Sequence, residues 1–338
     1  MNKVLYTIIL SIIVTSCNNE IDLLYPKPSI PVVYCIIDPT APLLTVTITK
    51  SVVGSQNALY LVSKKELCYY EYVNIQIFAL AKDSIIQSYT LHQSDITKNP
   101  GIFPQAPGYA YQSKIRKMNF DRFGNLICSD THISKFKLHI EIPESNDTID
   151  AEFELIKPDK ILLPRREGLK MELAPPGKFY AQFYPRTDNS YFKQLNFHIH
   201  YDELIDSVVY QRIDTIKMLS CIEDTNLDDL IEIKFDGVHF LNTIGAQLSP
   251  ASDSVLWRKP RSFDFSLITV DKSFRNYIDT YENAGEGTNL VWTNVTGGIG
   301  LFAHYVSATM RDFKFGQRTI DSLALSPRTK HLKFIRWE

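Results

Sequence analysis

Apolar and polar residues alternate along most of the chain, with a period of two that recurs in many short stretches. This period is typical of strands that bury one face, because successive side chains point to opposite sides of a sheet. The stretches are also rich in β-branched and aromatic residues, which strands favour. The pattern therefore predicts a mainly β protein. The clearest strands are expected at residues 43–49, 73–78, 136–142, 149–155, 192–199 and 230–235.

Helical periodicity is scarce. Residues 271–283 are the best candidate, because Asp271 can cap a helix and Phe274, Tyr277 and Ile278 fall on one face. A shorter helix is expected near residues 222–230. Many short strands with few helices indicate a sandwich or a barrel.

Prolines mark a boundary near the middle of the chain. Residues 158–177 contain Pro158, Pro164 and the pair Pro175 and Pro176. Proline cannot donate to a sheet ladder, so this segment is expected to be a linker. We expect two domains: an immunoglobulin-like or transthyretin-like sandwich over residues 28–160, and a second β-rich domain with one short helix over residues 165–338.

The N-terminus is similar to a lipoprotein signal. Lys3 precedes an apolar run at residues 4–14, which is shorter than the roughly 20 residues that span a bilayer. Residues 14–17 read Val-Thr-Ser-Cys, which resembles the lipobox of bacterial lipoproteins, where lipid is attached to the sulfur. An ordinary signal peptide with a chance cysteine is the alternative. The resemblance implies acyl chains such as palmitate on Cys17. It also divides the N-terminus into a signal peptide, 1–16, and a lipidated tether, 17–27.

Charge composition argues against nucleic-acid binding, whereas the cysteines are consistent with either disulfides or free thiols. The net charge is −2, with 36 basic and 38 acidic residues and no basic tract, which argues against a nucleic-acid partner. An exported protein permits disulfides, but free thiols packed as small apolar groups are an equal alternative. None of these cysteines lies at a zinc-finger spacing from another. The cysteines after Cys17 are Cys35, Cys68, Cys128 and Cys221.

Several segments together resemble a family of Bacteroidota outer-membrane lipoproteins that are often encoded beside SusC-like TonB-dependent transporters. After the lipobox, residues 25–38 form a proline-bearing segment and strand. Near the C-terminus, a strand at 263–270 and the helix at 271–283 precede an Asn-x-x-Gly-Gly-x-Gly-x-Phe motif at 294–302. The resemblance implies an accessory protein of the outer membrane and supplies no catalytic residue.

A short motif also recurs: Asp, then Ser or Thr, then an aliphatic residue. It occurs six times, whereas average residue usage gives about one match. The motif resembles the O-glycosylation sequon of Bacteroidota periplasmic proteins, although Asp-Ser also suits the turn before a strand. The candidate O-glycosylation sites are Ser84, Thr148, Ser207, Thr215, Ser254 and Ser322.

One group of side chains could bind a metal. His198, His200 and Asp202 alternate along an expected strand and would share one face, as the ligands of a zinc ion could. Alternation explains the same pattern if they form the solvated face of a half-buried strand, and we favour this interpretation. We therefore predict no metal and no cofactor.

No stretch of the sequence predicts a catalytic site. Gly297, Gly298 and Gly300 could suggest a phosphate loop, but they lead into a strand rather than a helix, so a tight turn or bulge is expected. Neither a nucleophile elbow nor an HExxH motif is present. Exposed rings, which could stack on sugars, are best sought at residues 69–72, Trp257 and Trp292.

The sequence thus predicts a non-enzymatic, lipid-anchored protein, held to the outer membrane by lipid on Cys17, on its periplasmic or cell-surface face. It would be an accessory or binding subunit associated with a TonB-dependent transporter. The alternative is a surface protein that binds or processes carbohydrate, which an aromatic platform beside carboxylates would favour.

Overall fold

The computed structural model describes residues 29–337 with internal gaps. Cys17, the helix expected near residues 222–230 and the side chain of Cys221 lie outside the described part. The gaps cover residues 53–56, 58–59, 62, 97–107, 116–117, 122, 129–130, 188–190, 222–229 and 284–291; the side chains of 191–193, 220–221 and 281–283 are likewise not described.

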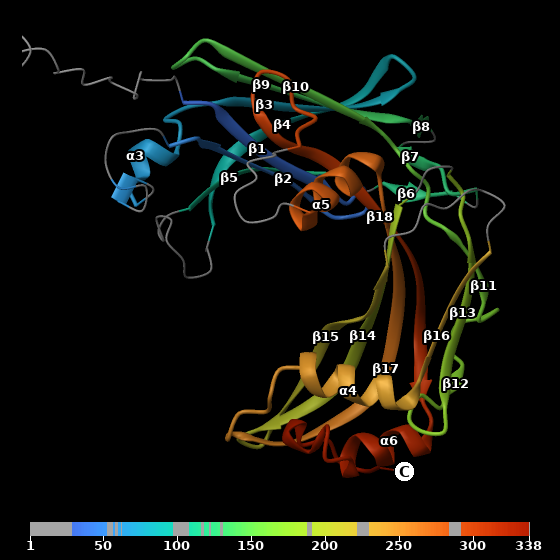
Figure 1. The fold of residues 1–338 in the computed structure, drawn as a ribbon. Coiled ribbons are helices and arrows are strands. Elements are labelled where there is room, and N and C mark those ends of the chain that lie inside the picture. Colours follow the sequence, from blue (N-terminus) through green and yellow to red (C-terminus); the bar gives the residue numbers. More distant parts are fainter. Residues whose placement is uncertain are drawn as a thin grey trace, which may run out of the picture.

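The protein is mainly β and has two lobes, as the sequence predicts (Figure 1). The first lobe contains the N-terminal strands and one short helix, α3 (Lys65–Cys68). Its strands are β1 (Pro31–Ile37), β2 (Leu43–Lys50), β3 (Asn74–Ala81), β4 (Ser84–Ile96), β5 (Gly108–Lys114), β6 (Asn119–Phe120), β7 (Leu126–Cys128), β8 (Thr131–Ile133), β9 (Lys135–Ile142) and β10 (Asp147–Glu154).

The rest of the chain contains longer strands, three further helices and a 3₁₀ turn, most of them in the second lobe. The helix at residues 272–283 lies beside the first lobe, where Tyr277 contacts Tyr34 of β1 (Figure 1). The helices are α4 (Gly237–Gln247), α5 (Lys272–Asn283), α6 (Gln317–Leu325) and the 3₁₀ turn η1 (Lys330–Leu332). The strands are β11 (Lys160–Leu163), β12 (Lys170–Met171), β13 (Lys178–Tyr184), β14 (Tyr191–Ile205), β15 (Val208–Cys221), β16 (Ile231–Asp236), β17 (Val255–Val270) and β18 (Ile299–Phe315).

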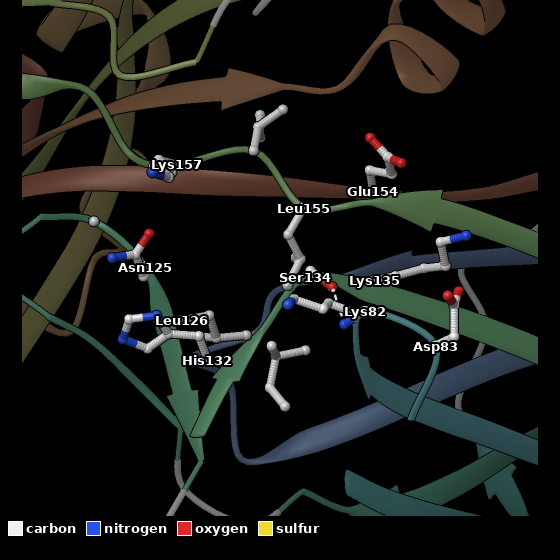
Figure 2. Close-up of a pocket in the computed structure, with 13 residues that line it drawn as sticks. Lys82, Asp83, Asn125, Leu126, His132, Ser134, Lys135, Glu154, Leu155 and Lys157 are labelled. Atoms are coloured by element: carbon white, nitrogen blue, oxygen red, sulfur yellow. Dashed lines mark hydrogen bonds between the residues drawn. The ribbon is translucent and has the colours of Figure 1, made fainter. Parts of the chain in front are cut away.

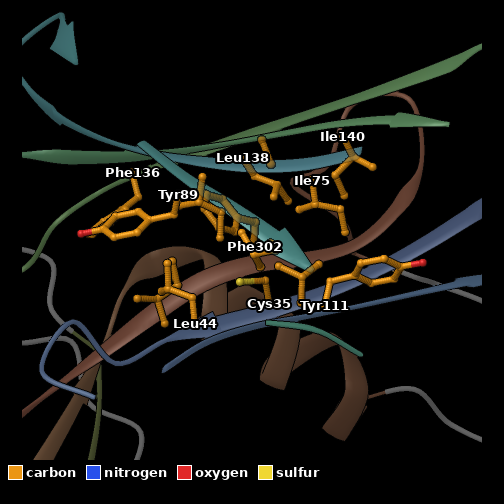
Figure 3. Close-up of a cluster of buried hydrophobic side chains, with 14 of the residues drawn as sticks. Cys35, Leu44, Ile75, Tyr89, Tyr111, Phe136, Leu138, Ile140 and Phe302 are labelled. Atoms are coloured by element: carbon orange, nitrogen blue, oxygen red, sulfur yellow. The ribbon is translucent and has the colours of Figure 1, made fainter. Parts of the chain in front are cut away.

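One twelve-stranded sheet runs through both lobes, in the order β10-β9-β3-β4-β5-β2-β1-β18-β17-β14-β15, with β12 beside β18. In the first lobe this sheet folds over itself at β4, which pairs with β3 along its first part and with β5 along its last five residues. The two layers enclose one apolar core, which Figure 3 shows with Leu138 and Ile75 facing Cys35 and Phe302. The sandwich-like first lobe follows from this fold-over.

The second lobe encloses a separate core. Strands β18, β17, β14 and β15 face the small sheet β11-β13-β16, and helices α4 and α6 close the lobe beyond the strands (Figure 1). Phenylalanine rings dominate this core: the ring of Phe197 meets that of Phe179 edge to face at 5.0 Å and stacks on that of Phe263 at 5.0 Å. Each ring belongs to the buried face of a strand whose alternation the sequence displays.

The predicted helix at residues 271–283 is confirmed as α5. Asp271 caps it, because the backbone N–H of Phe274 donates to Asp271 Oδ1 at 2.8 Å. The second half of the chain also contains α4 and α6, which the sequence analysis does not predict. Asp236 caps α4 by accepting from Val238 and His239. The first turn of α6 is capped from outside the helix, by Glu172, which accepts from the backbone and hydroxyl of Thr319.

The proline-rich segment at residues 158–177 is not a free linker. Its residues form β11, which pairs with β13, and β12, which pairs with β18. The prolines lie outside these paired residues: Pro158 precedes β11 and Pro164 follows it. They therefore bound the strands without interrupting a ladder.

Strand β18 belongs to both lobes. Its first six residues pair in parallel with β1, and its residues from Tyr305 onward pair with β17. Val295 and Phe302 accordingly lie in the core of the first lobe, although a division at residues 160–165 assigns them to the second domain. The first sandwich is thus completed by a segment from the far end of the chain.

The glycine motif at residues 294–302 brings this segment across the sandwich. Thr296 exchanges two backbone hydrogen bonds with Asp150 on the edge of β10, at 2.8 and 3.1 Å. The chain then crosses to β1, where Gly300 has φ +131° and a Cβ there would lie 1.8 Å from the carbonyl oxygen of Val33. Asn294 binds the backbone N–H and C=O of Phe302 as a strand would. The glycines therefore serve a close backbone crossing.

A buried histidine joins the lobes where β18 changes partners. His304 is fully buried; its Nε2 accepts from the backbone N–H of Ile156 at 2.9 Å, so Nδ1 donates to Asp271 Oδ2 at 3.0 Å. Its ring stacks on Phe153 at 4.4 Å. The His304 side chain thereby connects three parts of the chain: the segment after β10, strand β18 and the residue that caps α5.

The cysteines of the first lobe are buried, and those of β1 and β7, Cys35 and Cys128, carry free thiols. Burial raises the pKa of Cys35 well above its usual value, so little reactive thiolate forms. We expect native protein to alkylate at Cys35 at least about 100-fold more slowly than protein in urea. Peptide mass spectrometry after iodoacetamide treatment measures this. Rapid native labelling of Cys35 would contradict the packing.

Candidate functional site

One pocket combines aromatic rings with charged side chains, and it lies at the end of the first lobe where β1 begins. It has a volume of about 430 Å³ and combines three tyrosines with five charged side chains and an amide. We call it the tyrosine pocket. Its residues come from the end of β2, from α3 and the segment after it, from β4 and β5, and from the turn between β9 and β10: Lys50, Lys65, Glu66, Tyr69, Tyr70, Glu71, Gln93, Tyr109 and Glu144.

Two lysines lie against the aromatic rings. Lys65 Nζ donates to the hydroxyl of Tyr109 and lies 4.1 Å from its ring centroid. Lys50 Nζ lies 4.9 Å from the ring of Tyr70. The rings of Tyr69 and Tyr109 meet edge to face at 5.2 Å. These contacts fix the orientation of the tyrosines before any ligand is present.

Opposite charges are paired at the rim. Lys50 binds Glu144 at 2.6 Å, and this hydrogen bond is the main cause that lowers the pKa of the Glu144 carboxyl. Burial raises the pKa of Tyr70 to about 12. A side-chain hydrogen bond with Ser29 acts in the opposite direction and lowers this pKa. A hydroxyl that lines a pocket is a position where a ligand could donate or accept a hydrogen bond.

The aromatic rings that the sequence suggests as exposed differ in their exposure. Of residues 69–72, Tyr69 and Tyr70 are buried and Tyr72 is 59% exposed. Trp257 and Trp292 are half-buried. The tyrosines at residues 69 and 70 thus form a pocket wall rather than a flat platform.

A second pocket, of about 410 Å³, lies between the β7–β8 hairpin, the β3–β4 turn and the end of β10 (Figure 2). Its basic side chains include Lys82, His132 and Lys157, with Asp83 and Glu154 as counter-charges. Lys135 is bound by Glu152 at 3.0 Å, which raises the pKa of the lysine. His132 is 62% exposed. The described residues that line this pocket include no tyrosine, phenylalanine or tryptophan, so it is the second candidate.

The candidate metal ligands lie on the solvated face of β14, as the favoured interpretation predicts. Phe197, Ile199 and Tyr201 between them are buried. Each candidate has a partner on a neighbouring strand: His198 binds Thr215 and Ser266, His200 binds Asp264 at 3.1 Å, and Asp202 binds Arg261 at 3.2 Å. Burial is the main cause that lowers the pKa of His198. Among the described residues no cluster of three or more such side chains could hold a metal ion.

The six candidate glycosylation hydroxyls occupy different environments. Ser84, Thr148, Ser207 and Ser254 are exposed and lie in turns or at the first residues of strands, where Asp-Ser also serves a structural role. Thr215 is exposed in the middle of β15 and its hydroxyl binds His198 at 2.8 Å. Ser322 is half-buried on α6. The first four are therefore the more accessible sites.

No family model matches the chain. No curated protein matches it either. Among solved structures, a DUF4785 family protein from Legionella pneumophila aligns at 10% identity with a TM-score of 0.19, over 71% of this chain and 52% of that one. The chain thus spans about half the length of that protein.

Proposed function

We propose that this chain is a lipid-anchored outer-membrane protein that binds a ligand or partner, as an accessory subunit of a TonB-dependent transporter. The observation that carries the proposal is the lipobox-like sequence at residues 14–17. Cys17 lies twelve positions before Ser29, where the described fold starts, so an extended tether reaches at most about 40 Å.

The position of the tyrosine pocket supports this arrangement. The chain enters β1 beside the pocket: the backbone N–H of Ile30 donates to Ser51, the neighbour of pocket residue Lys50. An anchor attached there would hold the pocket near the membrane surface. Tethering raises the effective concentration of any neighbour in the same membrane, so modest affinity is sufficient. None of the described helices has the length and hydropathy to cross a membrane.

Replacing Cys17 by serine tests the anchor. We expect wild-type protein to incorporate radiolabelled palmitate and the variant to incorporate none, because sulfur is the lipid attachment atom. The intact mass of the purified wild type should exceed that of residues 17–338 by the mass of the acyl groups, plus glycans if the exposed sequons are occupied. A mass equal to the polypeptide alone would reject both modifications.

Association with a transporter is tested separately, by purification in mild detergent from the native membrane. Recovery of a TonB-dependent transporter at a fixed ratio supports the proposal. Recovery of the lipidated protein alone, at several detergent concentrations, would count against the accessory role while leaving the anchor in place.

Carbohydrate binding is the second candidate function, and the tyrosine pocket favours it. Tyrosine rings next to carboxylates suit sugars, which combine apolar faces with hydroxyl groups. If this is correct, Tyr109→Ala should weaken binding to a glycan identified by array screening at least about tenfold, because it removes a ring and the partner of Lys65. Tyr72→Ala is the matched control, since Tyr72 is exposed and does not line the pocket. Equal effects of both substitutions, measured by calorimetry, would reject the pocket.

A further inference from the structure

Strand β15 is the last strand of the large sheet, and its first six residues are all exposed. Four of them are apolar: Val208, Val209, Tyr210 and Ile213 are 50, 53, 42 and 62% exposed. In Figure 1 the strand borders the second lobe, with no labelled element beyond it. A long apolar edge is unusual as a free surface, because its unpaired backbone groups recruit another strand.

Two other stretches of strand edge in this sheet are occupied by described residues. At the opposite end of the sheet, Thr296 pairs with Asp150 on β10. At the far end of β15 itself, the side-chain amide of Gln247 binds both the N–H and the C=O of Lys217. Along residues 208–216, no hydrogen bond joins the outward backbone groups to another described segment. The protein thus protects part of this edge and leaves the apolar part open.

Two observations establish which backbone groups point outward. Gln247 binds Lys217 from outside the sheet, so the backbone groups of Lys217 face away from β14. At the other end, Ile205 and Val208 flank a two-residue turn, and such a pair is hydrogen-bonded within the hairpin. Because bonding alternates along a strand, the outward groups belong to residues 209, 211, 213 and 215.

We propose that this edge pairs with β15 of a second copy of the chain, antiparallel and centred on Gln211. In this register, the exposed Val209 of each copy lies opposite the exposed Ile213 of the other, on the same face of the sheet. Tyr210 lies opposite Arg212, whose guanidinium already contacts the Tyr210 ring within one chain at 5.2 Å. The hydrogen bonds between the two copies involve only outward backbone N–H and C=O groups that have no partner in another described segment of the monomer.

Neighbouring registers are less favourable. Centring on Arg212 would place two arginines opposite each other. Centring on Ile213 would place Val209 against Lys217, whose backbone Gln247 already occupies. That register would gain ion pairs between Arg212 and Asp214, but exposed ion pairs contribute little. Burial of two Val–Ile pairs therefore selects the register centred on Gln211.

The paired region is short, so the dimer should be weak in solution. Where both copies are anchored in one membrane, as the proposed function requires, a weak contact suffices because the effective concentration is high. The pairing itself does not depend on the lipid and can be tested without it. Ser207 and Thr215 lie opposite each other in this register, so unglycosylated protein is the appropriate sample.

The experiment uses residues 18–338, made without lipid or glycan, in sedimentation equilibrium over a wide concentration range. We expect reversible dimers, and at least tenfold weaker association in Val209→Lys/Ile213→Lys, which places charges on the edge. Ile85→Lys is the matched control, since Ile85 is 59% exposed on a different hairpin. Gln211→Cys should crosslink to itself through a short bismaleimide more efficiently than Ile213→Cys.

Three results would overturn the proposal. The first is a monomer at all concentrations with no crosslinking at position 211. The second is a dimer that tolerates the double lysine substitution as well as the control does. The third is capture of a different protein, instead of a second copy, by a photocrosslinker at position 211 in cells. Dimerisation of residues 18–338, which carry no lipid, would separate this inference from the proposed anchor.

Discussion

Gly300→Ala is expected to destabilise the first lobe by about 4 kcal/mol, one of the largest effects available to a single methyl group in this protein. The new Cβ would lie 1.8 Å from the carbonyl oxygen of Val33, so β1 and β18 could not remain paired there. The backbone at φ +131° is also one that alanine adopts poorly. Alkylation of Cys35 during urea unfolding reports on this lobe specifically, because Cys35 lies in its core.

Gly168→Ala separates the two causes. Gly168 also has a positive φ, +74°, but a Cβ there would meet nothing within 4 Å. Only backbone strain remains, so a loss of about 1–2 kcal/mol is expected. If the two substitutions reduced the free energy of unfolding equally, the close crossing at Gly300 would not be the reason for the glycine.

His304→Phe should destabilise the protein by about 3–5 kcal/mol. Phenylalanine keeps the ring that stacks on Phe153, but it leaves the N–H of Ile156 and one oxygen of Asp271 buried without a partner. The effect should appear in the urea midpoint measured by both tryptophan fluorescence and Cys35 alkylation, because His304 contacts both lobes.

His198→Phe is the control for His304. His198 also has two hydrogen-bond partners, Thr215 and Ser266, but it lies on the solvated face of β14, where water can replace one of them. A loss below about 1 kcal/mol is expected. Comparable losses for both histidines would show that burial at the junction contributes little.

The strands and α5 could be predicted because their signals are local. Alternation at residues 136–142 and the cap at Asp271 need no knowledge of the rest of the chain. Helix α6 could not be predicted, because Glu172, which caps its first turn, lies 147 positions before Thr319. The prediction of a linker from the prolines at 158 and 164 is wrong, because the effect of a proline depends on whether it lies inside a strand ladder or beside it.

The candidate site likewise contains residues that a local pattern indicates and residues that only distant contacts bring together. Residues 69–72 stood out as a dense aromatic run, and two of those tyrosines line the pocket. Lys50, Tyr109 and Glu144 did not stand out, because each is an ordinary residue in its own strand or turn. Only the folding of the sheet at β4 brings them together. No local pattern could have paired Lys50 with Glu144, which lie 94 positions apart.

Because β18 pairs with strands of both lobes, the first lobe cannot be completed until the C-terminal part of the chain has been synthesised. The parallel neighbour of β1 and the cover of the β10 edge are supplied by residues 294–304, which are synthesised only after the 293 residues that precede them. Until then, the N-terminal half must persist with two open strand edges, and so it is most vulnerable to proteases and to misassembly during biogenesis. A nascent or truncated chain ending near residue 290 should therefore require a chaperone, even though most of its strands are already present.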